Sequence, residues 1–184
     1  FDQNGEKISK SNGNCSSIDE WLTYAASESL SYYMYQKPRT AKRLSWDVIP
    51  KAVDEYHQNL RAYPDQDTTK HAANPVWHVN GGAVPGSTLD VPFAMLLNLA
   101  GVSAAEDKDR MWGFIQRYAP DASPHTHPDL DQAAGFAVRY FKDFVAPHRV
   151  FRAADDRETA ALSDLRARLS VWDGGLDAEE LQSI

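Results

Sequence analysis

Apolar side chains recur at helical spacing along most of the chain, and stretches rich in proline, glycine or charge separate the helical segments. In "VIPKAVDEYHQNLRAY", residues 48–63, Val53, Tyr56 and Leu60 lie three or four positions apart and so share one helix face. Asp47 precedes the segment as a capping residue. The pattern predicts one long amphipathic helix.

Two shorter helices are expected upstream of it. Residues 16–25, "SSIDEWLTYA", begin with two serines, either of which can cap a helix, and continue with two acidic residues that favour its positive end. Residues 27–35, "SESLSYYMY", predict a second helix capped by Ser27. Pro38 ends that pattern, so residues 36–43, "QKPRTAKR", are predicted to form an exposed basic connector.

Helical patterns also fill the second half of the chain. The nearly continuous apolar run "DVPFAMLLNLAG" predicts a buried helix that closes on Gly101. The next helix should begin at Ser103, with Glu106 as its reciprocal capping partner. Two more amphipathic segments follow, at 127–147 and 156–171.

Residues 64–87 are rich in proline, glycine, aspartate and asparagine, and they carry the least regular pattern. Within them "NPVWHVNGG", residues 74–82, predicts a brief strand that ends in an Asn80-Gly81 turn. The whole pattern predicts an all-α protein with at most one short β-hairpin. We expect two parts, 1–62 and 63–184, in a piece of a longer polypeptide, because the last residues continue a helical pattern without a stop signal.

Charge narrows the classes of partner. The net charge of -7 argues against indiscriminate binding to nucleic acid, and we expect no DNA partner. Residues 1–62 hold eight Lys/Arg and eight Asp/Glu, whereas residues 63–184 hold eleven against eighteen. A polyanion should therefore contact chosen patches. No apolar run approaches the ~20 residues of a membrane helix, and the single cysteine, Cys15, excludes an internal disulfide and suits the cytoplasm.

The segment "GEKISKSNGN", residues 5–14, carries the most specific chemistry. Small residues around Lys7 and Lys10 favour a mobile loop, whose ammonium groups can neutralise charge that develops on a leaving pyrophosphate. The hydroxyls of Ser9 and Ser11 can donate to phosphate oxygens. The plain alternative is a solvated polar loop.

The pentapeptide "KISKS", residues 7–11, resembles the KMSKS loop of class I aminoacyl-tRNA synthetases. With the following "WLTYAASESLSYYMYQKPRTAKRLSWDVIPKAVDEY", and with "NPVWHVNGG" and "FAMLLNLAGV" further on, the chain is similar to class I lysyl-tRNA synthetases over most of residues 5–102. Ile8 replaces the methionine of the motif, and Asn12 stands where a third lysine is expected.

The resemblance implies a lysine–tRNA ligase, which uses ATP, with Mg2+, to activate lysine and then transfers it to tRNA(Lys). Lys7 and Lys10 would be catalytic, and Lys7, Ser9, Lys10 and Ser11 would contact ATP. The family's nucleotide-binding domain, with its HIGH-type motif, has no counterpart in this sequence. We therefore expect ATP and lysine to bind through a missing N-terminal domain, and this chain alone to be inactive and to bind no cofactor.

The resemblance also implies stem-contact helices in residues 1–62 and an anticodon-binding region, similar to an α-helix cage, in 63–184. Phosphates would be contacted by the connector cations, and bases or phosphates by aromatic and cationic residues of the later helices. The same spacing in those helices serves core packing equally well. The candidate tRNA-binding residues are Lys37, Arg39, Lys42, Arg43, Trp112, Arg117, Arg139 and Lys142.

Other interpretations stay open from the residues alone. One is a stand-alone all-α RNA-binding or interaction domain in which "KISKS" is only a basic loop, and another is a class I synthetase for glutamate. The pair His125 and His127, with flanking prolines and no nearby cysteine, is a weak metal signal, and we predict no metal site. The expected location is the cytoplasm.

Overall fold

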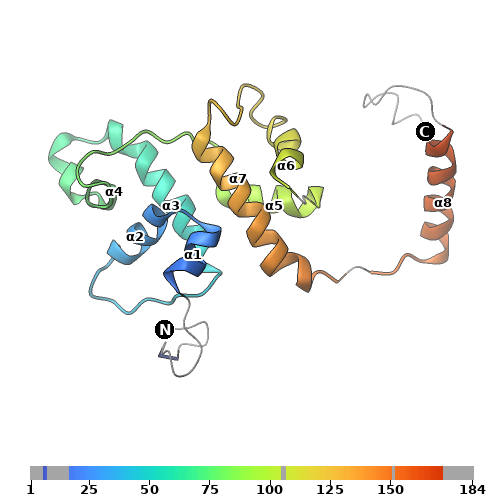
Figure 1. Ribbon diagram of the computed structural model, residues 1–184, viewed down its shortest axis with the longest axis horizontal. Coiled ribbons are helices and arrows are strands. Elements are labelled where there is room, and N and C mark those ends of the chain that lie inside the picture. Colours follow the sequence, from blue (N-terminus) through green and yellow to red (C-terminus); the bar gives the residue numbers. More distant parts are fainter. Residues whose placement is uncertain (1–5, 8–16, 105–106, 151, 172–184) are drawn as a thin grey trace. The chain divides into compact units, whose positions relative to one another are not determined.

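The computed structural model describes residues 6–7, 17–104, 107–150 and 152–171, and these residues form helices and connecting segments without any β-strand (Figure 1). The predicted all-α class is confirmed. Lys10 and the two loop serines, Ser9 and Ser11, lie outside the described residues. The helices, with η for 3-10 or π turns, are α1 Ile18–Tyr24, α2 Ser27–Tyr35, α3 Val48–Ala62, η2 Tyr63–Asp65, η3 Thr68–Ala73, α4 Pro75–Val79, α5 Phe93–Ser103, α6 Lys108–Ile115, α7 Pro128–Tyr140, η4 Phe141–Val145, η5 Ala146–His148 and α8 Asp156–Ser170.

Helix α3 contributes to two separate hydrophobic clusters. Ile49 and Val53, near its start, belong to the larger cluster. Tyr56 and Leu60, in its second half, belong to a smaller one, which they share with Tyr32 of α2 and Val76 of α4. The apolar residues of 48–63 therefore pack in two clusters, and α3 connects the larger cluster to the smaller one.

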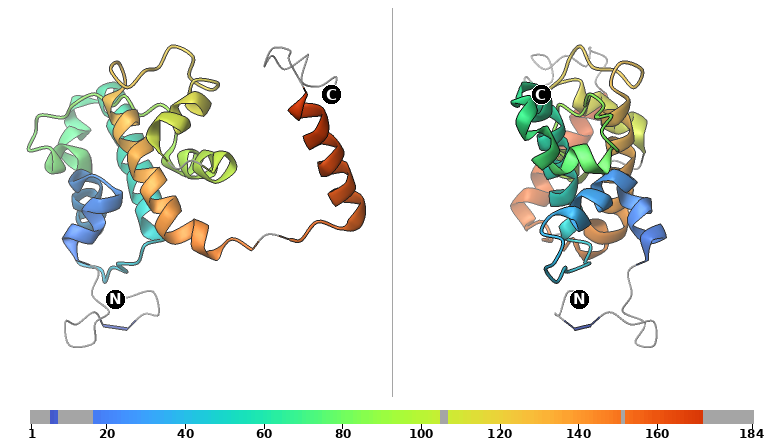
Figure 2. Two further views of the ribbon diagram at one scale, coloured as in Figure 1. Left: turned by 45° about the vertical axis from the view of Figure 1, so that its right-hand side comes forward. Right: turned by 90° about the vertical axis from the view of Figure 1, so that its left-hand side faces the viewer.

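The larger cluster is built mainly by α5, α6 and α7, which lie against one another in every view (Figure 2). Phe93 and Leu96 of α5, Met111 and Ile115 of α6 and Leu130 of α7 are completely buried. Burying one side chain of this size stabilises a fold by about 1.5–3 kcal/mol before entropy is counted. This cluster fixes the second half of the main unit.

Helix α1 begins as the sequence predicts, at a serine cap. The Ser17 hydroxyl accepts from Glu20 N at 3.1 Å, and the Glu20 carboxylate accepts from Ser17 N at 2.6 Å. At its other end Arg139 Nε donates to Thr23 O at 2.8 Å, and the Tyr24 hydroxyl donates to Asp143 Oδ2 at 2.8 Å. Burial and the Asp143 carboxylate together raise the pKa of Tyr24 to about 12. Helix α1 is thus attached to the end of α7.

The predicted strand in residues 74–82 is wrong, because Pro75–Val79 forms helix α4. Asn74 caps this helix, with Oδ1 accepting from Val76 N at 3.1 Å, and Pro75 takes the first helical position. Gly81 and Gly82 do form a turn, with φ angles of +61° and +87°, but this turn closes a helix. The motif Asn-Pro is a helix start here, not the flank of a hairpin.

Two predicted helix boundaries around residue 103 are also wrong. Helix α5 continues through Gly101 to Ser103, whose hydroxyl donates to Leu99 O at 2.6 Å, and it ends at Ala104 with φ of +45°. Helix α6 is capped by Asp107, which accepts from Arg110 N at 2.8 Å. Glu106, the partner predicted for the reciprocal cap, lies outside the described residues.

Smaller differences concern other helix ends. The residue before α2 is Ala26, so Ser27 is the first helical residue and not its cap. Asp47 precedes α3 but makes no capping hydrogen bond to it; instead its carboxylate accepts from the Ser45 hydroxyl. The helix expected at 127–147 is α7 followed by a π turn and a 3-10 turn.

Residues from 149 onward form a second compact unit, in which the structure describes α8. Asp155 caps this helix as a reciprocal pair with Glu158, at 2.8 and 3.0 Å, and Arg152 binds the same Glu158 carboxylate. None of the described residues of α8 is buried. The division at residues 148 and 149 is a structural one, and the functional boundary predicted at 62 and 63 stays a prediction.

Candidate nucleic-acid interface

The segment of residues 5–14, which we call the lysine loop, comes shortly before α1 in the sequence. Lys7 is described and exposed to solvent, whereas Lys10 is outside the described residues. The reciprocal cap at Ser17 fixes the point at which the chain enters the helix after this segment. The structure therefore places Lys7 on the surface and defines the element that follows the loop.

The basic connector between α2 and α3 is solvent-exposed over most of its length, as predicted. Lys37 takes a left-handed conformation, with φ of +49°, and its carbonyl accepts from Thr40 N at 3.0 Å. Arg39 and Arg43 are exposed, and the Arg43 carbonyl accepts the Tyr33 hydroxyl at 2.6 Å. The connector is thus a folded turn that presents guanidinium groups to solvent.

Lys42 differs from its neighbours because it is partly buried. Its ammonium group lies 5.0 Å from the centre of the Tyr33 ring and donates to Gln36 O. Burial, and after it the charge of Lys37, lowers the pKa of Lys42 below its ordinary value of 10.5. Lys42 is therefore held in place before any ligand arrives.

A hollow of about 800 Å³ opens between the connector, α3 and the start of α4. We call it the lysine hollow; its walls include Tyr33, Lys37, Lys42, Lys51, Glu55 and Pro75. Lys51 Nζ lies 3.6 Å from Glu55 Oε1, and Gln36 Nε2 donates to the same carboxylate at 3.2 Å. Three ammonium groups against one carboxylate leave this hollow with a surplus of positive charge, which suits an anion.

Lys51 is a member of this group that sequence reasoning missed. Its side chain is 77% exposed, on the first turn of α3, and it contacts Glu55 four residues later. In the sequence this spacing indicates an ordinary helix-surface pair. Only the fold shows that the pair borders the same hollow as the connector lysines.

Trp112, by contrast, does not lie on a nucleic-acid surface. It is 6% exposed, and its indole Nε1 donates to Asp131 Oδ1 at 2.9 Å. Lys108 Nζ binds the other oxygen of Asp131 at 2.6 Å. The ring offers no open face to a base, so we leave Trp112 out of the proposed interface.

The three remaining candidates of the later helices are exposed. The Arg117 guanidinium lies 5.1 Å from the Phe114 ring centre, and the Arg139 guanidinium lies 5.0 Å from that of Phe136. Lys142 is exposed in the π turn after α7. Arg139 is already bound to Thr23 O through Nε, so a ligand could reach only the rest of its fork.

The fold brings one connector cation close to the end of α7. Arg43, Trp46, Tyr140 and Phe144 line a common hollow of about 340 Å³. The Tyr140 hydroxyl donates to Trp46 O at 3.2 Å, and burial raises the pKa of Tyr140 above its ordinary value. Tyr140 is 8% exposed and therefore acts as a wall of this hollow more than as a stacking surface.

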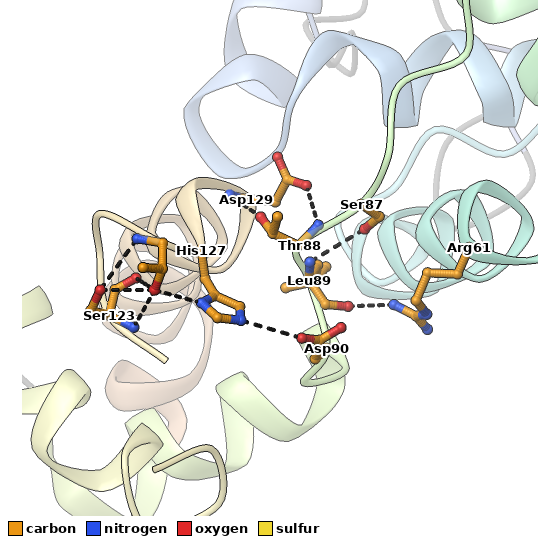
Figure 3. Close-up of polar contacts among 9 residues, drawn as sticks. Arg61, Ser87, Thr88, Leu89, Asp90, Ser123, His127 and Asp129 are labelled. Atoms are coloured by element: carbon orange, nitrogen blue, oxygen red, sulfur yellow. Dashed lines mark hydrogen bonds and ion pairs between the residues drawn. The ribbon is translucent and has the colours of Figure 1, made fainter. Parts of the chain in front are cut away.

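The segment before α5 is anchored on both of its sides (Figure 3). Thr88 and Asp129 exchange hydrogen bonds, with Thr88 N donating to Asp129 Oδ2 at 2.7 Å and Asp129 N donating to Thr88 Oγ1 at 3.0 Å. Arg61 of α3 donates to Leu89 O, and His127 Nε2 lies 3.5 Å from Asp90 Oδ2. These contacts join α3 and the start of α7 to the connecting segment at residues 88–90. They fix the positions of these two helices, which lie next to the candidate surfaces.

One of the two histidines of the predicted weak metal signal, His127, has local partners. His127 Nδ1 lies 2.9 Å from Thr126 Oγ1, in addition to the Asp90 contact. In the described residues no group of three or more His, Cys, Asp or Glu side chains is arranged to hold a metal ion. Among those residues there is also no helix with the length and apolar character needed to cross a bilayer.

The comparisons with known proteins agree with these features. Residues 1–83, which include the lysine loop, the connector, α3 and α4, match the family described as tRNA synthetases class I (K). This family gives the class to which the first part of the chain is related. No solved structure gives a significant match.

The particular relatives are lysine–tRNA ligases. The chain is 67% identical over 184 residues to "Lysine--tRNA ligase" of Roseobacter denitrificans. The match covers 100% of this chain and 35% of the relative. It is 46% identical to the protein of the same name from Rickettsia bellii and 45% identical to that from Rickettsia rickettsii, over 99% of this chain. The resemblance to class I lysyl-tRNA synthetases is confirmed, and the chain spans 35% of the length of these relatives.

Proposed function

We propose that the polypeptide carrying this chain is a lysine–tRNA ligase, which activates lysine with ATP, releases pyrophosphate and transfers the lysyl group to tRNA(Lys). The observation that carries the proposal is the 67% identity along all 184 residues to a lysine–tRNA ligase. The lysine-specific relatives favour lysine over glutamate as the amino acid. The two-step reaction belongs to the cytoplasm, where tRNA and ATP are present.

In this proposal the lysine loop acts on ATP. Lys7 and Lys10 lie on opposite sides of Ser9 in "KISKS", and their ammonium groups stabilise the charge that grows on the departing pyrophosphate. Ser9 and Ser11 donate to phosphate oxygens. The Lys7 side chain is exposed to solvent, so burial does not restrict its movement. Mg2+ would share the neutralisation of the triphosphate, as a companion of ATP.

The helical body binds tRNA(Lys) in this proposal. Residues 1–62 contact the stems and residues 63–184 the anticodon region. Phosphates meet the exposed connector cations and the lysine hollow, whose charge is positive although the whole chain carries -7. The proposed contacts are Lys37, Arg39, Lys42, Lys51, Arg43, Arg117, Arg139 and Lys142.

The test removes one loop ammonium from the full-length ligase. Lys10→Ala should lower the rate of lysyl-adenylate formation by about 100-fold, because one preorganised charge contact to a reacting group is worth about that much. The measurement is lysine-dependent ATP–pyrophosphate exchange, followed by aminoacylation of tRNA(Lys) with lysine and with glutamate. The matched control is Lys70→Ala, which removes an exposed lysine outside every candidate site.

Two results would contradict the proposal. One is an unchanged exchange rate in Lys10→Ala. The other is aminoacylation with glutamate in preference to lysine. The 184-residue chain alone, assayed beside the full-length protein, should show no exchange, since the amino-acid and adenine sites are proposed to lie elsewhere in the ligase.

A further inference from the structure

Three aromatic rings from α2 and α4 lie against one another beside the lysine hollow. The rings of Tyr35 and His78 are stacked, with centres 4.8 Å apart and planes 23° from parallel. Trp77 meets His78 edge-on, at 4.9 Å and 85°. Tyr35 is 42% exposed, and His78 is exposed. We call Tyr35 and His78 the ring pair.

A hydrogen bond from His78 and the packing of the neighbouring Trp77 fix the orientation of the ring pair. His78 Nε2 lies 2.7 Å from Ala72 O, so this nitrogen donates and the imidazole is fixed in one orientation. Trp77 packs over Gly82, where a Cβ atom would lie 3.4 Å from the indole. A flat surface that is already fixed loses little entropy when a ligand stacks on it.

Packing of the fold does not account for the ring pair. The small cluster on this side of α3 consists of Tyr32, Tyr56, Leu60 and Val76, with partly buried neighbours, and neither ring of the pair belongs to it. Both rings stay on the surface, where burial contributes little to stability. An exposed aromatic plane of this kind is what proteins use to stack unpaired bases.

The ring pair also adjoins the lysine hollow, because each of its two residues is close in the sequence to residues that line the hollow. Tyr35 directly precedes Gln36 and Lys37, which line the hollow. Pro75, another wall of the hollow, is three residues before His78 and so lies on the same face of α4. A stacking plane and a positive hollow are therefore neighbours at the junction of α2 and α4, which pack together (Figure 1).

We propose that this junction is a site for one unpaired nucleotide of RNA. The base stacks on the open face of Tyr35, and a phosphate of the same strand enters the hollow between Lys37, Lys42 and Lys51. Lys51 exchanges its contact with Glu55 for the phosphate. The site rests on the proposed binding of RNA, and it adds a preference for an unpaired base at a place that the sequence marks only as basic.

The test uses the full 184-residue chain and two RNA duplexes that share one strand and differ in the complementary strand. One duplex has a single unpaired 2-aminopurine, and in the other this base is paired. The chain should bind the unpaired form about tenfold more tightly, within the range of one base stacked on one ring, and the 2-aminopurine fluorescence should be quenched on binding. Affinities come from fluorescence anisotropy over a series of salt concentrations.

Variants then separate the ring from the charge. Tyr35→Ala should lose the tenfold preference and the quenching, whereas Tyr35→Phe, which keeps the ring, should retain both. Lys51→Gln should weaken both duplexes equally and lower the slope of log K against log salt by about 1, the effect of one phosphate contact. The matched control is Arg157→Gln, an exposed cation of α8. Circular dichroism of each variant checks that the helices are intact.

The outcomes distinguish this site from the proposed function. Failure of the wild-type chain to bind a tRNA(Lys) transcript or either duplex at low salt overturns RNA binding and the site together. Salt-dependent binding of the transcript with equal affinity for both duplexes, or with a preference that survives in Tyr35→Ala, overturns the nucleotide site and leaves the proposed function standing.

Discussion

Single carboxylates organise much of this fold, because several of them bind two partners from another element. Asp131 holds Lys108 and the Trp112 indole, which joins α6 to α7. The same contacts explain why Trp112 is structural although Gly113, next to it in the sequence, is exposed. A buried indole N–H that lost this acceptor would carry the full cost of desolvation.

The first residue-scale prediction concerns His57 of α3. Its ring is partly buried, with Nδ1 at 2.8 Å from Ser87 Oγ, and burial lowers its pKa below the ordinary 6.5 in spite of the nearby Asp129 carboxylate. The unfolded chain therefore takes up a proton near pH 6.5 that the folded chain resists. The contribution of neutral His57 to the unfolding free energy should be fully present above pH 6.5 and should be lost as the pH drops below it.

This dependence can be isolated with His57→Gln, measured by urea unfolding at pH 7.5 and pH 5.5. Arg61, Asp54 and Glu28 also influence the ring, so the comparison uses the same two pH values for both proteins. The loss of unfolding free energy between pH 7.5 and 5.5 should be larger in the wild type than in the variant. An equal loss would assign the effect to other groups.

At the scale of elements, α5 depends on a cap that it does not carry itself. Pro92, the residue before the helix, makes no side-chain cap. Asp54 of α3 supplies it, with Oδ1 accepting from Phe93 N at 2.5 Å and Oδ2 accepting from Ala94 N at 3.2 Å. Because an acceptor at a helix N-terminus satisfies its orphan donors, this contact links α3 to the central helix of the larger cluster.

Asp54→Ala should lower the unfolding free energy by about 1–2 kcal/mol, the usual cost of a lost cap. The measurement is urea denaturation followed by circular dichroism, with an unchanged m-value. Asp121→Ala, which removes an exposed carboxylate of a loop, is the matched control and should stay within ~0.5 kcal/mol. Equal stability of the two variants would show that the cap has no energetic role.

The sequence predicted elements whose signals are local. The apolar spacing of α3, the serine cap of α1 and the helical pattern of residues 156–171 are each contained in one short stretch of the chain, and the three predicted helices were confirmed. The strand expected at 74–82 failed because Asn74 and Pro75 fit either a turn or a helix start. Caps such as Asp54 could not be predicted, since partners 39 or 40 residues apart leave no pattern in the chain.

The candidate site divides in the same way. The connector cations stand together in the sequence, and four positive residues within "KPRTAKR" are visible at once. The ring pair and Lys51 come from three elements that only the fold assembles. Trp112 shows the opposite limit, since helical spacing alone does not tell a buried aromatic residue from an exposed one.

For the whole molecule, the described structure consists of two units with unequal packing. Every buried residue of the larger and smaller clusters precedes residue 142. None of the described side chains of helix α8, in the second unit, is buried, and an isolated helix of 15 residues is marginal in water. Stability therefore resides in the first unit.

A chain that ends at His148 should unfold at the same temperature as the full chain, to within ~2 °C, the shift that about 0.5–1 kcal/mol causes in a protein of this size. Far-UV circular dichroism should lose helical signal while the near-UV signal of the buried tryptophans stays unchanged. The full-length chain measured at equal concentration is the reference. A midpoint lowered by more than ~5 °C would contradict this division of stability.

The attachment of α1 to the end of α7 has a consequence for the order of events on the ribosome. Thr23 and Arg139, which share a hydrogen bond, are separated by 116 positions. At the usual pace of about 5–20 residues per second, roughly 6–23 s pass between the synthesis of the two. Helix α1 is therefore synthesised well before its partner in α7, and it lacks the Arg139 hydrogen bond until that residue has been made.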